Sequence, residues 1–414
     1  MITNLKKYLP YLLPLLLIFS RSVADITIVL ISILFIYHSY KKLGWGWVKE
    51  KWFCFALIFW VYCLTINSAF SINPTESLAY SLFFIRWPIF AMALAYWILT
   101  DIKSLKKFLL AMTLVLIFII FDTWWQFFFE QDIFGFEKYM PNRLTGPFKG
   151  NPHVGAWIAK LILLPPLFLI LYDKLKLQEH QNCLTYSFFI ISTILFLSVA
   201  ITGERMALLL SLASIFILFI GLALNKIFLL KKISLLLLFS FFAILIFAYS
   251  FPHTTERAYF STIEKILNWR TSDYGLVWQS AYDVWVQSPL FGAGLHKYRE
   301  ACENLGIYGS SYLNAIGPGV CFHPHNISLQ LLSETGLVGF ILFFVMVIVL
   351  AFTSLKIYFT SKLWLSFALV FNIIFTCFLP IASSTSFFAN KYGAIVWLLV
   401  GVMLATNRLF KKEN

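Results

Sequence analysis

Long runs of apolar residues, separated by short polar segments, extend along almost the whole chain. A helix that spans the hydrocarbon core of a membrane needs about 20 mainly apolar residues. The pattern therefore predicts an all-α polytopic membrane protein with about twelve transmembrane helices. Pro10 and Pro14 fall in the first run and favour a tilted or broken helix there. The predicted spans, with approximate limits, are 8–20, 23–38, 52–67, 78–99, 107–129, 154–172, 184–201, 206–223, 233–250, 328–354, 363–382 and 392–408.

Two polar segments, 130–153 and 251–327, are longer than the others and are predicted to lie on the same side of the membrane. Segments as long as the second one are usually functional or disordered. Its many aromatic and apolar residues argue against disorder. We therefore expect a transmembrane bundle of about nine helices in 1–250, a large, partly helical loop or cap in 251–327 before the tenth helix, and about three more transmembrane helices in 328–414.

The long segment contains one clear amphipathic stretch. Residues at helical spacing would place a mostly aromatic face on one side of a helix. That face could lie on the membrane surface or pack on the bundle. Ser288-Pro289 is predicted to end the helix, and Gly292 and Gly294 to form a turn. The residues of the predicted face are Tyr274, Trp278, Ala281, Tyr282 and Trp285.

Composition and charge agree with a membrane protein. The chain is 60% hydrophobic and only 12% charged, whereas soluble domains carry about 25% charged residues. The net charge of +13 would suggest nucleic acid in a soluble protein. Here 19 of the 32 Lys and Arg residues fall on one side if the N-terminus is cytoplasmic, so the basic excess indicates topology, with both termini cytoplasmic. The start also resembles a secretory signal with a cleavage site after Ala24, but this orientation favours a retained helix.

The six cysteines divide by location. Cys54, Cys63 and Cys377 fall in predicted spans, where cysteine is an ordinary small apolar residue. Cys302 and Cys321 both lie in the long outer segment, where a disulfide is permitted. The alternative is two free thiols. A disulfide there would stabilise the fold by about 3 kcal/mol and hold His323 and His325 close to the preceding segment.

Several basic residues stand at positions where a charge needs an explanation. Arg205, in TGER, lies between two apolar runs, so it either snorkels or pairs with Glu204, or binds an anion such as a diphosphate. Arg143 lies in a Gly- and Pro-rich turn that is either a plain surface loop or a place where backbone approaches a ligand closely. Arg86 falls near mid-membrane, and we expect it to pair with a carboxylate such as Asp122.

His325 is the residue best suited to acid–base chemistry. A histidine titrates near neutral pH, and a general base of that kind suits deprotonation of a sugar hydroxyl. Asn326 could orient it, and the predicted helix that follows directs its positive end toward the site. His323 is a second candidate for the base. His323-Pro324-His325 could hold one metal ion, but no acidic or cysteine cluster accompanies it, so no metal is expected.

These pieces together resemble the bacterial O-antigen ligase and polymerase superfamily of membrane glycosyltransferases. His325, Asn326, Gly336 and Gly339 have the spacing of the ligase motif. The predicted architecture, with a large loop just before the histidine helix, is also similar. The matching pieces are RLTGPFKGNPH (143–153), TGERMALL (202–209), QSPLFGAGLHKYRE (287–300) and HPHNISLQLLSETGLVG (323–339).

The resemblance implies an enzyme of the bacterial inner membrane with a periplasmic site. It would transfer a glycan from undecaprenyl diphosphate to a hydroxyl, which in ligases belongs to lipid A–core, with no metal, nucleotide or other cofactor. His325 would be the base, and Arg205 and Arg143 would bind the diphosphate. A further arginine comes from the long segment: first Arg270, then Arg299 or Arg257. A polymerase or protein O-glycosyltransferase of the same superfamily, and a transporter of lipid-linked sugars, are the alternatives.

Overall fold

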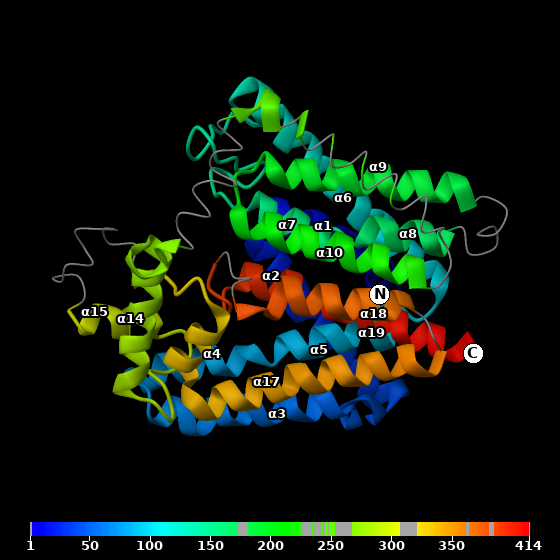
Figure 1. Cartoon of the computed structure of the whole chain (residues 1–414). Coiled ribbons are helices and arrows are strands. Elements are labelled where there is room, and N and C mark those ends of the chain that lie inside the picture. The colour runs from blue at the N-terminus through cyan, green and yellow to red at the C-terminus, as the bar shows by residue number, and fades with distance from the viewer. Residues whose placement is uncertain are drawn as a thin grey trace.

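The protein is a bundle of roughly parallel helices, seen from the side in Figure 1. The computed structural model describes residues 2–172, 181–224, 267–306, 321–361, 364–380 and 385–413, with isolated residues between 234 and 252. Within these ranges the regular structure is helical, and β-pairing is limited to two isolated bridges. The all-α class is therefore confirmed.

The first part of the bundle contains ten described helices and four short π- or 3₁₀-helical segments. The π-helical segments extend α2, α3 and α5 at their C-terminal ends. The helices are α1 (Ile2–Phe19), α2 (Arg21–His38), α3 (Lys51–Tyr62), α4 (Pro74–Phe84), α5 (Arg86–Ala93), α6 (Ile102–Phe129), α7 (Val154–Leu161), α8 (Leu164–Tyr172), α9 (Gln181–Ala200) and α10 (Arg205–Leu224), and the short segments are η1 (Ser39–Leu43), η2 (Gly46–Lys49), η3 (Cys63–Asn67) and η4 (Leu94–Ile98).

The second part contains the cap and three long or apolar helices. A 3₁₀ turn leads into the first cap helix, and a π-helical segment extends α18. The elements are η6 (Trp269–Thr271), α14 (Asp273–Gln287), α15 (Tyr298–Asn304), α17 (Ile327–Ser361), α18 (Trp364–Ile373), η9 (Ile374–Phe378) and α19 (Asn390–Glu413).

Five described helical stretches are long and apolar enough to cross a membrane, which supports a polytopic membrane protein. Six further apolar helices are shorter. The predicted span 233–250 lies mostly outside the described residues, so the count of twelve stays a prediction. The five long stretches are Arg21–Leu43, Pro74–Ile98, Ile102–Phe129, Ile327–Lys356 and Asn390–Lys411.

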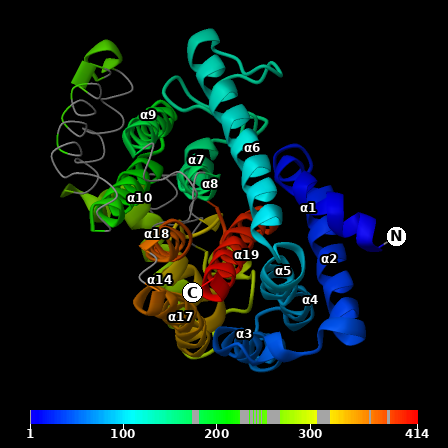
Figure 2. The same ribbon diagram turned by 90° about the vertical axis from the view of Figure 1, so that its right-hand side faces the viewer.

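Helix α19 occupies the middle of the bundle, where Figure 2 shows it surrounded by the other helices. It packs against α5, η4 and α18, and 89% of the apolar stretch within Asn390–Lys411 is buried. Its Trp397 is fully buried and stacks on Trp52 of α3 with a centroid distance of 6.3 Å. Because α19 is buried on nearly all sides, its first turn can meet several other helices.

Helix α14 crosses the end of the bundle, at a steep angle to α17 and α3 (Figure 1). We call the end of the bundle where α14 and α15 lie the cap end. Of the two alternatives for the predicted aromatic face, packing on the bundle is wrong for its tyrosines, and a position on the membrane surface stays a prediction. The face that packs against α17 and α15 is made of small side chains, whereas Tyr274 and Tyr282 are exposed. Small residues allow the close approach that large rings would prevent. The buried residues of α14 are Val277, Ser280, Ala281 and Val284.

Helix α17 is interrupted at Gly336, whose φ of 66° and ψ of −175° are not helical. Backbone from the turn before α15 pairs with this interruption. The amides of Ala293 and Gly294 donate to the carbonyls of Ser333 and Glu334 at 2.8 and 2.9 Å. On the other side of the break, the amide of Leu337 donates to the carbonyl of Pro289 at 2.9 Å. The break therefore anchors the cap to the bundle.

Arg86 pairs with a carboxylate, but the expected partner, Asp122, is wrong. Its Nη2 lies 3.1 Å from Asp25 of α2 and donates to Asn390 of α19 at 2.9 Å. Asp122 instead accepts a hydrogen bond from the amide of Ile133. The Arg86 cluster thus joins α2, α5 and the first turn of α19.

Candidate functional site

His325 immediately precedes Asn326 and the first turn of α17, and its φ is 51°. A residue other than glycine rarely adopts this conformation, which costs about 1 kcal/mol or more and concentrates at functional sites. The His325 ring lies 3.9 Å from the ring of His323 and meets Tyr274 of α14 edge-on at 5.9 Å. The cap helix therefore borders the histidine.

Asn326 has a different contact from the one expected. Its side-chain oxygen accepts a hydrogen bond from the amide of Leu329 at 3.1 Å. This is the geometry of an N-cap, which satisfies an amide that the helix itself leaves unpaired. Asn326 therefore fixes where α17 begins, and it positions His325 through the backbone.

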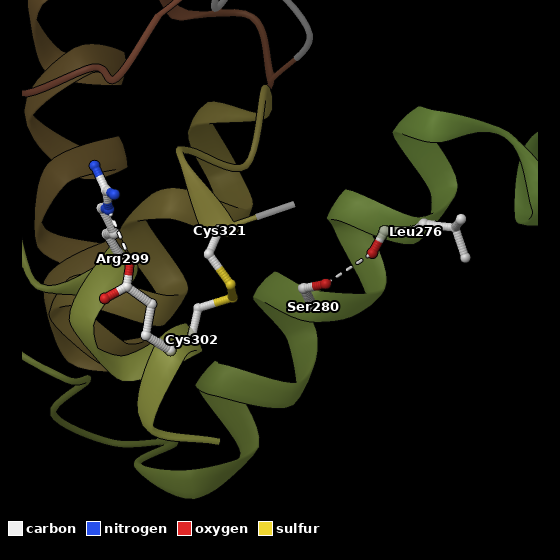
Figure 3. The surroundings of a disulfide bond; sticks show 6 residues. Leu276, Ser280, Arg299, Cys302 and Cys321 are labelled. Carbon is white, nitrogen blue, oxygen red and sulfur yellow. Dashed lines mark hydrogen bonds and ion pairs between the residues drawn. A yellow bond between two sulfur atoms is a disulfide. The ribbon is translucent and has the colours of Figure 1, made fainter. Parts of the chain in front are cut away.

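Cys302 of α15 and Cys321 are joined by a disulfide in the structure, with a sulfur–sulfur distance of 2.02 Å. Figure 3 shows the bond beside α14, near the hydrogen bond from Ser280 to the Leu276 carbonyl. Both cysteines are fully buried with Val277, Ala281 and Val284 in a small apolar cluster separate from the main core. The bond ties the chain two residues before His323 to α15.

The loops that hold Arg143 and Arg205 are joined to each other. The amide of Leu144 donates to the Thr202 carbonyl at 3.2 Å. Glu204 accepts hydrogen bonds from the first amides of α7, at 2.7 Å from Gly155 and 3.2 Å from Ala156. A β-carbon on Gly155 would lie 2.5 Å from the Thr202 hydroxyl, so only glycine permits this approach.

Arg205 is the first residue of α10 and is half-buried. The Glu204 carboxylate accepts hydrogen bonds from the first amides of α7, and its pairing with Arg205, one of the expected alternatives, stays a prediction. Burial raises the pKa of Glu204 to about 7, and Arg143 opposes this rise. Glu204 therefore links Arg143, the start of α7 and the start of α10.

Arg143 is oriented toward the end of its own loop. Its Nη2 donates to the carbonyl of Pro152 at 3.5 Å, and its guanidinium lies over the Tyr139 ring at 5.6 Å. Its buried Nε has no hydrogen-bond partner within the described residues. An unsatisfied buried donor is rare and calls for a ligand or water.

His153 links these loops to the His325 segment. It lies within electrostatic range of Arg143 and His325, and also of Arg21 and Lys391 at the starts of α2 and α19. Burial, followed by those four groups, lowers its pKa to about 3. The structure thus gathers basic groups from four parts of the chain at one place. Sequence reasoning missed His153, Arg21 and Lys391, because the only available signal was their position next to the ends of apolar runs.

The region 188–344, which contains Arg205 and His325, matches the family model described as O-antigen ligase. This segment is similar to the O-antigen ligase family. The resemblance to the ligase and polymerase superfamily is thereby confirmed, and members of this family are glycosyltransferase-like enzymes. No curated protein matches the chain.

The O-antigen ligase segment also contains the candidate loop arginines. Arg270 is exposed in η6 and lies over the Trp269 ring at 5.5 Å. Arg299 is 59% exposed and forms an ion pair with Glu303 at 2.8 Å (Figure 3). Its guanidinium also lies over the Phe322 ring at 5.0 Å. Arg257 lies outside the described residues. Arg270 is four residues before Tyr274, which contacts His325, so it remains the first choice.

The buried histidines of the candidate site, His153 and His323, predict a pH dependence of stability. Burial lowers the pKa of both His153 and His323 to about 3, below the usual 6.5 of the unfolded chain. A lowered pKa gives stability that is complete above pH 6.5 and is lost as the pH falls toward 3. We expect the thermal midpoint of the detergent-solubilised protein to fall between pH 7 and pH 5. The free energy of unfolding should fall by about 1 kcal/mol for each histidine and each pH unit.

The His153→Asn variant should lose part of that dependence while His323 keeps the rest. Melting curves at pH 7 and pH 5 for both proteins give the comparison. An equal fall in the two proteins would show that His153 is not buried as described.

Proposed function

We propose that this chain is an O-antigen ligase-like glycosyltransferase of the bacterial inner membrane, with both termini cytoplasmic. It takes a glycan from undecaprenyl diphosphate and attaches it to a hydroxyl of lipid A–core at the periplasmic face. No cofactor takes part.

One observation carries the proposal: in a protein with a segment similar to O-antigen ligases, basic groups from several parts of the chain and His325 all lie within electrostatic range of His153. A diphosphate needs cations, and an attacking hydroxyl needs a base. The buried Nε of Arg143 has no hydrogen-bond partner within the described residues. Arg205 follows the turn that is hydrogen-bonded to the Arg143 loop through Leu144 and Thr202. Guanidinium groups bind phosphate oxygens in pairs, so both arginines fit the leaving group.

The chemistry is a single displacement. His325 accepts the proton of the acceptor hydroxyl as its oxygen forms a bond to the anomeric carbon. The bond from that carbon to the diphosphate oxygen breaks, and the electron pair leaves with undecaprenyl diphosphate. Arg143 and Arg205 stabilise the charge that develops there. One direct attack inverts the configuration of the anomeric carbon.

Two other functions fit parts of the molecule. A polymerase or a protein O-oligosaccharyltransferase of the same superfamily would use the same donor and a different acceptor. A transporter of lipid-linked sugars belongs to another class, and transporters place their binding residues near the membrane midplane. The basic groups here meet at the beginnings of helices, which favours the enzyme.

Deletion of the gene separates these functions. For a ligase, we expect lipopolysaccharide reduced to bare core, while long glycans accumulate on undecaprenyl diphosphate. Core capped with a single repeat unit, without long lipid-linked chains, would indicate a polymerase. Normal lipopolysaccharide would contradict the proposal, and complementation with the intact gene is the control.

A further inference from the structure

Lys391, in the first turn of α19, lies beside the histidines but outside the O-antigen ligase segment. It is half-buried, with its ammonium over the Phe148 ring at 4.0 Å and near the Trp157 ring at 5.3 Å. Aromatic faces attract a cation and carry no net charge. They therefore hold the Lys391 ammonium in place without neutralising it.

The nearest aspartate on α2 is already occupied. Asp25 pairs with Arg86 at 3.1 Å and accepts a hydrogen bond from the amide group of Asn390 at 3.2 Å. These bonds fix the first turn of α19 against α2 and α5. They direct the Asp25 carboxylate to Asn390 and Arg86, and they leave Lys391 facing the side where His153 lies.

The surroundings of Lys391 are rich in positive charge. Among the described residues, the charged groups within electrostatic range of Lys391 are Arg21 and Glu204. Glu204 also interacts with Arg143 and Lys160 and is hydrogen-bonded by two amides of α7. One carboxylate thus faces three basic side chains, those of Arg143, Lys160 and Lys391. Buried charges are normally paired, so this imbalance points to an anionic ligand.

Lys391 and His153 also share a recess. Its walls include Trp157, Lys160 and Tyr392, and the Lys160 ammonium lies over the Tyr392 ring at 4.8 Å. His153 is in turn within electrostatic range of His325. The recess therefore places Lys391 next to His153, which lies within electrostatic range of the proposed base.

We propose that Lys391, supported by Arg21, binds a phosphate of the lipid diphosphate donor and so completes the site of Arg143 and Arg205. This assignment rests on the proposed function. Lys391 donates hydrogen bonds to phosphate oxygens as a mobile point charge, while Phe148 and Trp157 limit where its ammonium can move. The diphosphate is thereby held from the α19 side as well as from the two arginine loops.

The test is equilibrium binding of undecaprenyl diphosphate and of uncharged undecaprenol to the full-length protein in detergent. We expect Lys391→Gln to weaken undecaprenyl diphosphate binding at least about tenfold, as for loss of one hydrogen bond to a charged group. Its binding of undecaprenol should stay unchanged. Lys391→Arg should retain most of the affinity. Lys411→Gln, which removes an exposed lysine at the other end of α19, is the matched control and should bind like the wild type.

Each other outcome overturns the assignment. Equal binding of undecaprenyl diphosphate by Lys391→Gln and the wild type would exclude the contact and leave the proposed function intact. Equal losses for undecaprenol and undecaprenyl diphosphate would show a structural role instead. Displacement of the diphosphate lipid by an equal amount of phosphatidylglycerol would identify a general headgroup site. A wild type that prefers neither undecaprenyl lipid would contradict the proposed function as well.

Discussion

Replacing His325 by alanine is expected to reduce glycan transfer by about 10² to 10⁴-fold, the contribution typical of a general base. The ring lies at the start of α17, next to the basic groups that would hold the diphosphate. Its loss removes the proton acceptor and leaves the donor site in place. The measurement is single-turnover transfer from an undecaprenyl diphosphate-linked glycan to lipid A–core by purified protein.

His323→Ala is the matched control, because the two rings are 3.9 Å apart in the same loop. Burial lowers the pKa of His323 to about 3, so it is a poor base near pH 7, and its variant should keep most of the activity. Both variants should bind undecaprenyl diphosphate like the wild type. Near-normal transfer by His325→Ala would remove the histidine from its assigned role, and a larger loss in His323→Ala would transfer that role to His323.

Gly336→Ala is expected to have the largest effect on stability, about 3 kcal/mol or more, because conformational strain and a steric clash add together. Its φ of 66° with ψ of −175° belongs to a region that only glycine occupies readily. A β-carbon would also lie 2.3 Å from the carbonyl oxygen of Leu290. That oxygen belongs to backbone hydrogen-bonded across the break, so it cannot move without detaching the cap. Thermal unfolding in detergent and the yield of monodisperse protein measure the effect.

The Gly135→Ala variant separates the strain of a positive φ from the steric clash of an added β-carbon. Gly135 has a φ of 85° but no atom within 4 Å of an added β-carbon, so this variant carries the conformational strain alone, about 1 kcal/mol. If Gly336→Ala melts no lower than Gly135→Ala, then the pairing between the cap and the helix break is not as tight as described.

Local patterns allowed much of the fold to be predicted. Apolar runs predicted where most helices lie, because burial in lipid or in the bundle constrains every turn of a helix. The end of α14 at Gln287, before Ser288-Pro289, followed from turn chemistry. The pairing of Cys302 with Cys321 followed from their location in the same outer segment. Each of these conclusions depended on residues near one another in the sequence.

The features that were predicted wrongly or not at all involve contacts between residues far apart in the sequence. Nothing local separates Asp25 from Asp122 as the partner of Arg86, because the choice depends on which helix lies beside α5. The break at Gly336 is required by backbone that arrives from residues 288–294. The packed face of α14 follows from close contact with α17, which favours its small residues over its aromatic ones. Lys391 could not be predicted as a site residue, because its neighbours come from distant segments: α2, the loop before α7, and α7 itself.

The Asp25–Arg86–Asn390 cluster also affects how the protein is made. The hydrogen bond between Asn390 and Asp25 joins residues 365 positions apart. During synthesis α2 enters the membrane long before α19 exists. Until α19 inserts, Arg86 lacks its hydrogen bond to Asn390, and the middle of the bundle is missing. The basic recess is therefore completed only after the ribosome has produced α19, so a partly synthesised chain would lack the donor site that we propose between Arg143 and Lys391.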